Sequence, residues 1–126
     1  MAVFGQMLLD GGSYGNTRVL SPASVREMTR NQIPGISASF ESENFPEAAW
    51  GLGVGVHGNK KSLRDGSLHS PAALSHGGAG GTQWWVDPVY EIVGVYFSVA
   101  LNYYPTMMEK WNADLFVNAV TAAVEE

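Results

Sequence analysis

A serine, a histidine and a run of glycines stand next to one another at residues 75–81. Ser75 and His76 are the residue types of a nucleophile and its general base, but adjacent strand residues point to opposite faces, so these two side chains cannot easily meet. A glycine run cradles phosphate before a helix N-terminus, whereas residues 82–87 predict a strand. The remaining chemistry is that of bare strand backbone, whose N–H groups can hold a carbonyl or an oxyanion. The alternative is a glycine bulge that shapes a twisted sheet.

Two further glycine motifs fail in their structural context. Residues 11–15 match the G-x-S-x-G nucleophile elbow around Ser13, but that motif requires a strand before the serine, and here a helix precedes it. Residues 53–58 match the G-x-G-x-x-G dinucleotide fingerprint, which requires a helix directly afterwards, and here a polar loop begins. We interpret the first as a loop that ends a helix and the second as a strand with a glycine face.

The histidines do not predict a metal site. His57, His69 and His76, with Asp65 between them, have no standard ligand spacing, and we expect the two histidines outside the glycine strand to be solvated in loops. The chain contains no cysteine, which excludes disulfides, thiol catalysis and Cys-ligated zinc. We therefore predict neither a metal nor a cofactor.

Charge and hydropathy exclude two classes of partner. Seven basic and twelve acidic residues give a net charge of −5, without the basic stripe that nucleic-acid binding requires. No apolar run is long enough to span a bilayer. No basic residue precedes Arg18, so the chain lacks the charged start of a signal peptide and, as it stands, is expected in the cytoplasm.

The elements that position the glycine strand form an α+β pattern. Residues 2–10 have helical spacing and stop at Gly11-Gly12, but this helix begins at Met1 without a cap, as if its earlier part were missing. Ser21-Pro22 caps a second helix, and residues 31–48 are irregular, which is typical of a functional or mobile loop.

The strands predict a three-stranded antiparallel sheet with the helices packed on it. Residues 50–56 alternate between a bulky face and a bare glycine face. Residues 72–78 and 82–87 read as strand, with the glycines between them as a bend or bulge, and Asp87-Pro88 then makes a turn. Residues 90–101 are apolar on both faces, which is typical of a central strand, and Pro105-Thr106 opens the last helix.

Four segments follow one another in a familiar order: FGQMLLDGG, RVLSPASVREMTRNQ, WGLGVGV and LSHGGAGGTQWWVDPVYEIVGVYFS. This series resembles the C-terminal part of the serine β-lactamase-related family, which includes class C β-lactamases, D-alanyl-D-alanine peptidases and related esterases. The resemblance covers residues 2–124, and its most specific part is the His-Gly-Gly strand with its Asp-Pro turn. It implies the C-terminal part of the β-lactamase/transpeptidase-like fold, and acyl transfer through a covalent acyl-serine.

The resemblance assigns one wall of a substrate cleft to this chain. His76-Gly77-Gly78 matches the family's Lys-Thr-Gly or His-x-Gly strand. By this resemblance the backbone N–H of Ala79 is one half of the oxyanion hole. His76 then positions the substrate or polarises the serine and tyrosine side of the site.

The family's other motifs are absent. No serine stands three residues before any of the three lysines, Lys60, Lys61 and Lys110, so the chain has no S-x-x-K and no identified catalytic residue. Tyr14-Gly15-Asn16 fits the Tyr-x-Asn pattern but follows the FGQMLLDGG segment, whereas the family's tyrosine motif precedes it, so we interpret the match as chance. Residues 1–126 are thus expected to form one partial domain, without the N-terminal half and its helical subdomain.

An open edge follows from this expectation. In the family, N-terminal strands pair beside the strand that corresponds to residues 90–101. Without those strands an apolar edge invites pairing with another chain. We therefore expect a homo-oligomer, or pairing with the missing half, through this edge.

Three functional hypotheses remain. In the first, the chain is a fragment or subunit of a serine acyl hydrolase that acts on a small acyl substrate, contributes the His76–Ala79 wall and is inactive alone. In the second, it is a stand-alone, non-catalytic module for binding or oligomerisation. In the third, it is a new hydrolase that uses Ser75 or Ser13 with local histidines. The substrate itself does not follow from the sequence.

Overall fold

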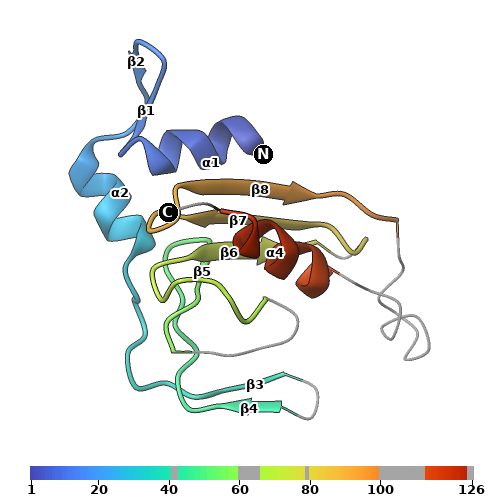
Figure 1. Ribbon diagram of the computed structural model, residues 1–126. Helices are drawn as coiled ribbons and strands as arrows, with labels where there is room; N and C mark the ends of the chain where they lie inside the picture. The colour runs from blue at the N-terminus through green and yellow to red at the C-terminus, as the bar shows by residue number, and fades with distance from the viewer. Residues whose placement is uncertain (41–42, 60–65, 79, 100–112, 125–126) are drawn as a thin grey trace.

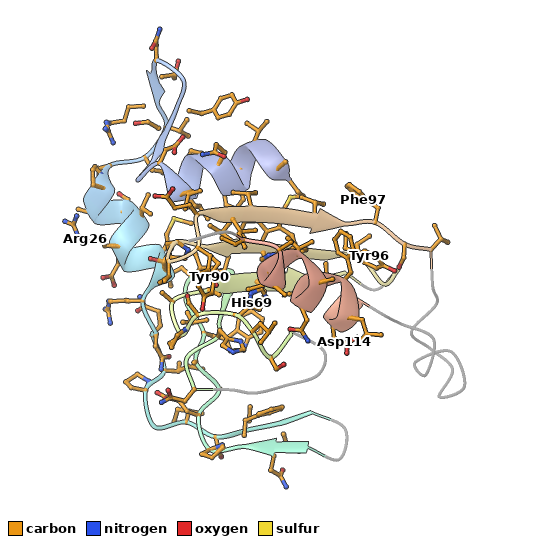
Figure 2. All side chains as sticks on the ribbon, in the orientation of Figure 1. Arg26, His69, Tyr90, Tyr96, Phe97 and Asp114 are labelled. Atoms are coloured by element: carbon orange, nitrogen blue, oxygen red, sulfur yellow. The ribbon has the colours of Figure 1, made fainter. Side chains whose placement is uncertain are left out.

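A computed structural model describes residues 1–40, 43–59, 66–78, 80–99 and 113–124 of the chain. These residues form three helices and eight strands in the order α1 (Ala2–Leu9), β1 (Ser13–Tyr14), β2 (Thr17–Arg18), α2 (Pro22–Thr29), β3 (Ala38–Phe40), β4 (Glu43–Phe45), β5 (Gly55–Val56), β6 (Leu74–Gly77), β7 (Gln83–Asp87), β8 (Ile92–Tyr96) and α4 (Ala113–Ala122). The largest sheet is antiparallel, with the order β5-β6-β7-β8. The predicted α+β class with an antiparallel sheet and packed helices is confirmed (Figure 1).

The glycine run closes a hairpin, so residues 72–87 form two strands where the sequence predicted one bent strand. The Gly78 N–H donates to the Thr82 carbonyl at 2.8 Å, and the Gly81 N–H donates to the Gly78 carbonyl at 2.9 Å. β6 and β7 then pair in antiparallel register, with His76 opposite Trp84. The sheet therefore has four strands instead of three, because Gly81, at a φ of +83°, lets the chain reverse.

The prediction of one strand over residues 50–56 is wrong. Trp50 pairs with Gly55, and the Gly51 N–H donates to the Val54 carbonyl at 2.8 Å, so these residues form a tight turn. Gly53 sits in this turn with a φ of +81°. Only Gly55 and Val56 belong to the sheet, as β5. The alternation of glycine and bulky residues reflects a turn that requires glycine at the left-handed position.

The two faces of the sheet have separate cores, because side chains alternate along β7. Trp84 and Val86 pack with Met7 and Leu8 of α1. Trp85 packs with Val117 of α4 on the other face. Figure 1 shows α4 in front of the sheet and α1 running alongside β8. One face of the sheet thus packs against α1, with Val25 of α2 in the same core, and the other face packs against α4.

Glycine residues allow neighbouring elements to pack closely on both faces of the main sheet. A Cβ at Gly5 of α1 would lie 2.5 Å from Cγ1 of Val93 and 3.0 Å from Nε1 of Trp84, so its absence lets α1 reach the sheet. A Cβ at Gly94 of β8 would overlap the indole ring of Trp85. These two glycines set the spacing of the layers.

The last strand lies at the edge of the sheet in the described part of the chain, not at its centre as its apolar sequence predicted. β8 spans Ile92–Tyr96 and pairs with β7. Beyond it, Phe97 and Val99 are 77% and 99% exposed. Residues 100–101 of the predicted strand, like the predicted start of the last helix at Pro105, lie outside the described residues.

The local signals at the helix ends are confirmed. The Ser21 hydroxyl accepts from the Ser24 N–H at 3.0 Å with Pro22 at the start of α2, whereas α1 has no side-chain cap at its first turn. Gly11, at a φ of +63°, follows the end of α1. The irregular segment 31–48 contains the hairpin β3–β4, which lies apart from the main sheet (Figure 1). None of the helices in the described ranges has the length and apolar character needed to cross a membrane.

Candidate functional site

A cleft of about 250 Å³ lies at the hairpin end of the sheet, on the face that carries α1. His76, Gly77 and Gly78 of the predicted site line it. The opposite part of its lining is apolar and includes Phe4, Trp84 and Phe97. Three of the four predicted site residues therefore lie together at one cleft, and the fourth, Ala79, lies outside the described residues.

The backbone edge of β6 is open beside this cleft. Both backbone polar groups of Gly78 bond within the loop of the β6–β7 hairpin, since its N–H donates to Thr82 and its carbonyl accepts from Gly81. Backbone groups alternate in direction along an antiparallel strand, so the N–H and C=O of Gly77 face the other side. β5 lies on that side but pairs only with Leu74 and Ser75. Within the described residues, no strand covers the Gly77 edge.

His76 is exposed and its ring is held in place on the cleft side of β6. Its Nδ1 lies 2.8 Å from the Gly77 carbonyl oxygen, and its ring meets the Trp50 ring edge-on, with centroids 6.0 Å apart. A carbonyl oxygen only accepts, so Nδ1 carries the hydrogen in this contact and Nε2 of the neutral ring is an acceptor. His76 can therefore accept a hydrogen bond from a hydroxyl group in the cleft.

Ser75 and His76 do not form a catalytic pair. Ser75 pairs with Trp85 and shares the α4 face, while His76 pairs with Trp84 and shares the α1 face. This arrangement agrees with the strand alternation predicted from the sequence.

Comparison with known proteins shows what this chain is similar to. No protein-family model matches the chain. Over 125 residues the chain is 32% identical to proteins called "Putative D-alanyl-D-alanine carboxypeptidase" in Salmonella paratyphi B and Salmonella newport, covering 98% of this chain and 26% of each relative. Its fold matches a β-lactamase from Mycobacterium bovis with a TM-score of 0.71 and 24% identity, over 94% of this chain and 41% of that one. These similarities support the assignment of the chain to the serine β-lactamase-related family.

The match to this family is partial in extent. The chain spans about a quarter of the length of the curated relatives. A penicillin-binding protein homologue from Caulobacter crescentus shares the fold with a TM-score of 0.65 and 21% identity, over 94% of this chain and 29% of that one. The similarity supports the assignment of the described fold to the C-terminal part of the β-lactamase-like fold.

The other two histidines are buried, so the prediction that they are solvated is wrong. His57 and His69 are 4% and 3% exposed, and their ring centroids lie 5.5 Å apart. His69 Nδ1 lies 3.9 Å from a carboxylate oxygen of Asp87, and its ring is near Trp85 on the α4 face. His76 lies on the opposite face, and Asp65 lies outside the described residues. In the described part of this chain, no three potential ligand side chains come together.

Asp87 organises this buried cluster, and sequence reasoning missed its role beyond the turn. Its fully buried carboxylate accepts from the Ser70 N–H at 2.7 Å, the Ser70 hydroxyl at 2.6 Å and the Val89 N–H at 3.0 Å. These bonds join the loop before β6 to the β7–β8 turn. An aspartate at the end of a strand and before proline was the available sign, because such side chains often bond backbone N–H groups two residues on.

Ser13 lies far from the cleft. It begins β1, which pairs with β2 and follows the C-terminal end of α1, whereas the cleft includes Met1 and Phe4 at the helix start. An eight-residue helix is about 12 Å long, so the two sites are separated by that length. Ser13 also begins a strand, whereas the nucleophile elbow requires a helix after its serine.

Proposed function

We propose that this chain supplies one wall of the substrate cleft in a serine acyl hydrolase, as a single partial domain. The observation that carries the proposal is the Gly77 edge of β6, which no described strand covers and which lies next to His76 at the cleft, with the Gly77 carbonyl oxygen bonded to His76 Nδ1. An uncovered strand edge with glycine at its surface lets the carbonyl of a substrate reach the backbone. The family similarity supports acyl transfer as the chemistry.

In this proposal the residues of the wall have distinct roles. The Ala79 N–H donates to the developing oxyanion when a serine oxygen attacks the acyl carbonyl, while the Gly77 edge aligns the substrate backbone. His76 accepts from a substrate or enzyme hydroxyl through Nε2. The serine and its lysine come from another segment or another chain, because S-x-x-K does not occur in these 126 residues.

Complementation tests this function. The chain is assayed with a chromogenic ester and a β-lactam, alone and mixed with the part of the Salmonella relative that lies outside the matched region. We expect turnover and fluorophosphonate labelling in the mixture, with the label on the added segment, and a lower rate with His76→Ala. Labelling of a serine in the chain alone would contradict the proposal and favour Ser75 or Ser13 as a nucleophile.

A non-catalytic module that binds a partner is the second candidate. It is favoured by Phe97 and Val99, which are large apolar side chains exposed beyond the β8 edge. An open strand with exposed apolar residues can pair with a second copy of the chain or with the missing half. A clean monomer at micromolar concentration in size-exclusion chromatography with light scattering would count against self-association.

A further inference from the structure

Trp50 lies at the outer edge of the main sheet, beside the strand that carries His76. It pairs with Gly55, and Gly55 pairs with Ser75 of β6, so Trp50 is one position beyond β5. A Cβ at Gly55 would lie 3.9 Å from Cζ2 of Trp50, so the indole ring packs beside the bare backbone of this glycine. The glycine leaves room for the ring to extend from the edge of the sheet towards β6.

The backbone around Trp50 is fixed on several sides. The Trp50 carbonyl accepts from the Gln32 N–H at 2.7 Å, and the Leu52 N–H donates to the Met28 carbonyl of α2 at 2.8 Å. A Cβ at Gly51 would overlap the same Met28 carbonyl oxygen, so the turn is pressed against the end of α2. The Trp50 side chain is nevertheless 43% exposed. Trp50 is therefore a firmly anchored aromatic residue outside the two cores.

The Trp50 ring contacts His76 without lining the cleft. The two rings meet edge-on, with an interplanar angle of 82° and centroids 6.0 Å apart. His76 is among the residues that line the cleft, whereas Trp50 is absent from the described lining. An edge-on aromatic contact is favourable beyond the area that it buries. Trp50 thus restricts the orientation of the His76 ring from outside the space that a ligand would occupy.

This restriction determines which ring nitrogen of His76 carries the hydrogen. His76 is exposed, and the bond of its Nδ1 to the Gly77 carbonyl oxygen, at 2.8 Å, competes with water and with other rotamers. The tautomer of a histidine follows from the hydrogen bond that one of its nitrogens makes. A contact that holds the ring at the Gly77 carbonyl therefore keeps the hydrogen on Nδ1 and leaves Nε2 as an acceptor.

We propose that Trp50 is a positioning residue for His76: it holds the imidazole in the orientation in which Nδ1 donates to the Gly77 carbonyl and Nε2 accepts. The use of Nε2 to accept from a hydroxyl group during acyl transfer rests on the proposed function. The orientation and the tautomer do not, because they follow from the contacts of this chain.

The histidine tautomers of the ¹⁵N-labelled chain test the inference. Long-range ¹H–¹⁵N spectra are recorded at about pH 8.5, where an ordinary histidine is neutral, and the His76 signals are assigned by their loss in His76→Gln. We expect a protonated Nδ1 and an unprotonated Nε2, with NOEs between the His76 and Trp50 rings. In Trp50→Ala the ratio of the Nδ1–H to the Nε2–H form falls about fivefold, and Trp50→Phe, which keeps an aromatic ring, recovers most of it. Leu52→Ala, a matched control with a side chain 51% exposed in the same turn, leaves the ratio unchanged.

The outcomes separate this inference from the proposed function. An Nε2–H form in the parent, an unchanged ratio in Trp50→Ala, or an equal loss in Leu52→Ala overturns the inference, whatever the turnover in the complementation assay. Absence of NOEs between the two rings also overturns it, and this measurement needs no variant. The expected ratios without turnover in the complemented mixture support the inference and contradict the proposed function. Turnover that falls in Trp50→Ala and recovers in Trp50→Phe supports both.

Discussion

Gly94→Ala is the substitution with the clearest expected loss of folding stability. The added Cβ would overlap three atoms of the Trp85 indole, Cε2, Cζ2 and Cη2. Trp85 is 0% exposed and packs against Val117 and Phe116, so the ring has no free space to move into. Overpacking a core costs about 1–3 kcal/mol, and displacing a tryptophan from its site about 3–5 kcal/mol. Alanine recovers up to about 1 kcal/mol of backbone entropy relative to glycine.

We therefore expect Gly94→Ala to lower the free energy of unfolding by about 3 kcal/mol. With a urea m-value of about 1.5 kcal/mol/M, the midpoint measured by circular dichroism falls by roughly 2 M. Gly80→Ala is the matched control, because its Cβ meets one atom, the Ser98 carbonyl oxygen at 3.9 Å. We expect Gly80→Ala to change the free energy of unfolding by no more than about 0.5 kcal/mol. Equal midpoints for the two variants would refute the inferred packing of Trp85 on Gly94.

Three further substitutions test other contacts. Asp87→Ala leaves the Ser70 and Val89 N–H groups without their buried acceptor and lowers stability by about 3 kcal/mol or more in urea unfolding. Asn118→Ala removes the acceptor of two loop N–H bonds, at 2.9 and 3.1 Å, that tie α4 to residues 67–68, and raises hydrogen exchange in that loop with a loss of about 1–2 kcal/mol. The hydrogen bond from Arg30 lowers the pKa of Glu27 below 4.5, so its small contribution to stability is present at neutral pH and is lost as the pH falls through that lowered pKa. Glu27→Gln should therefore unfold slightly earlier than the parent at pH 7 and at the same midpoint in strong acid, and a gap that persists in acid would contradict the pairing.

Local signals in the sequence predicted local structure well. Ser21-Pro22 gave the start of α2 and Gly11-Gly12 the end of α1, because capping involves only neighbouring residues. Asp87-Pro88 likewise marked the turn into β8. The apolar runs also marked the positions of β6, β7 and β8, but not the short β5.

Two errors arose where glycine fits more than one backbone path. The glycine run at 77–81 can form either a bulge or a hairpin. The hydrogen bond from the Gly78 N–H to the Thr82 carbonyl makes it a hairpin, and this bond depends on how the strands pair. The alternation at 50–56 suits a strand until Gly53 is known to be left-handed. Neither choice is encoded in hydrophobic periodicity alone.

The site was predicted only in part, because some of its residues are brought together by contacts across the fold that the local sequence does not reveal. His76, Gly77 and Gly78 were found from their motif and share one cleft, but its apolar wall is formed by Phe4 and Phe97, which are distant in sequence. The burial of His57 and His69 was missed because polar neighbours in the sequence indicate a loop, while burial depends on contacts across the fold.

Trp84 and Trp85 are neighbours in sequence that report on different halves of the molecule. Trp84 is buried beneath α1 and Trp85 behind α4, and β7 is the element that the two halves share. Their fluorescence therefore provides two internal optical probes separated by a single peptide bond. Comparing the emission of Trp84→Phe and Trp85→Phe during unfolding shows whether the two helices detach in one cooperative step or separately. The central strand thus makes the cooperativity of this small fold directly measurable.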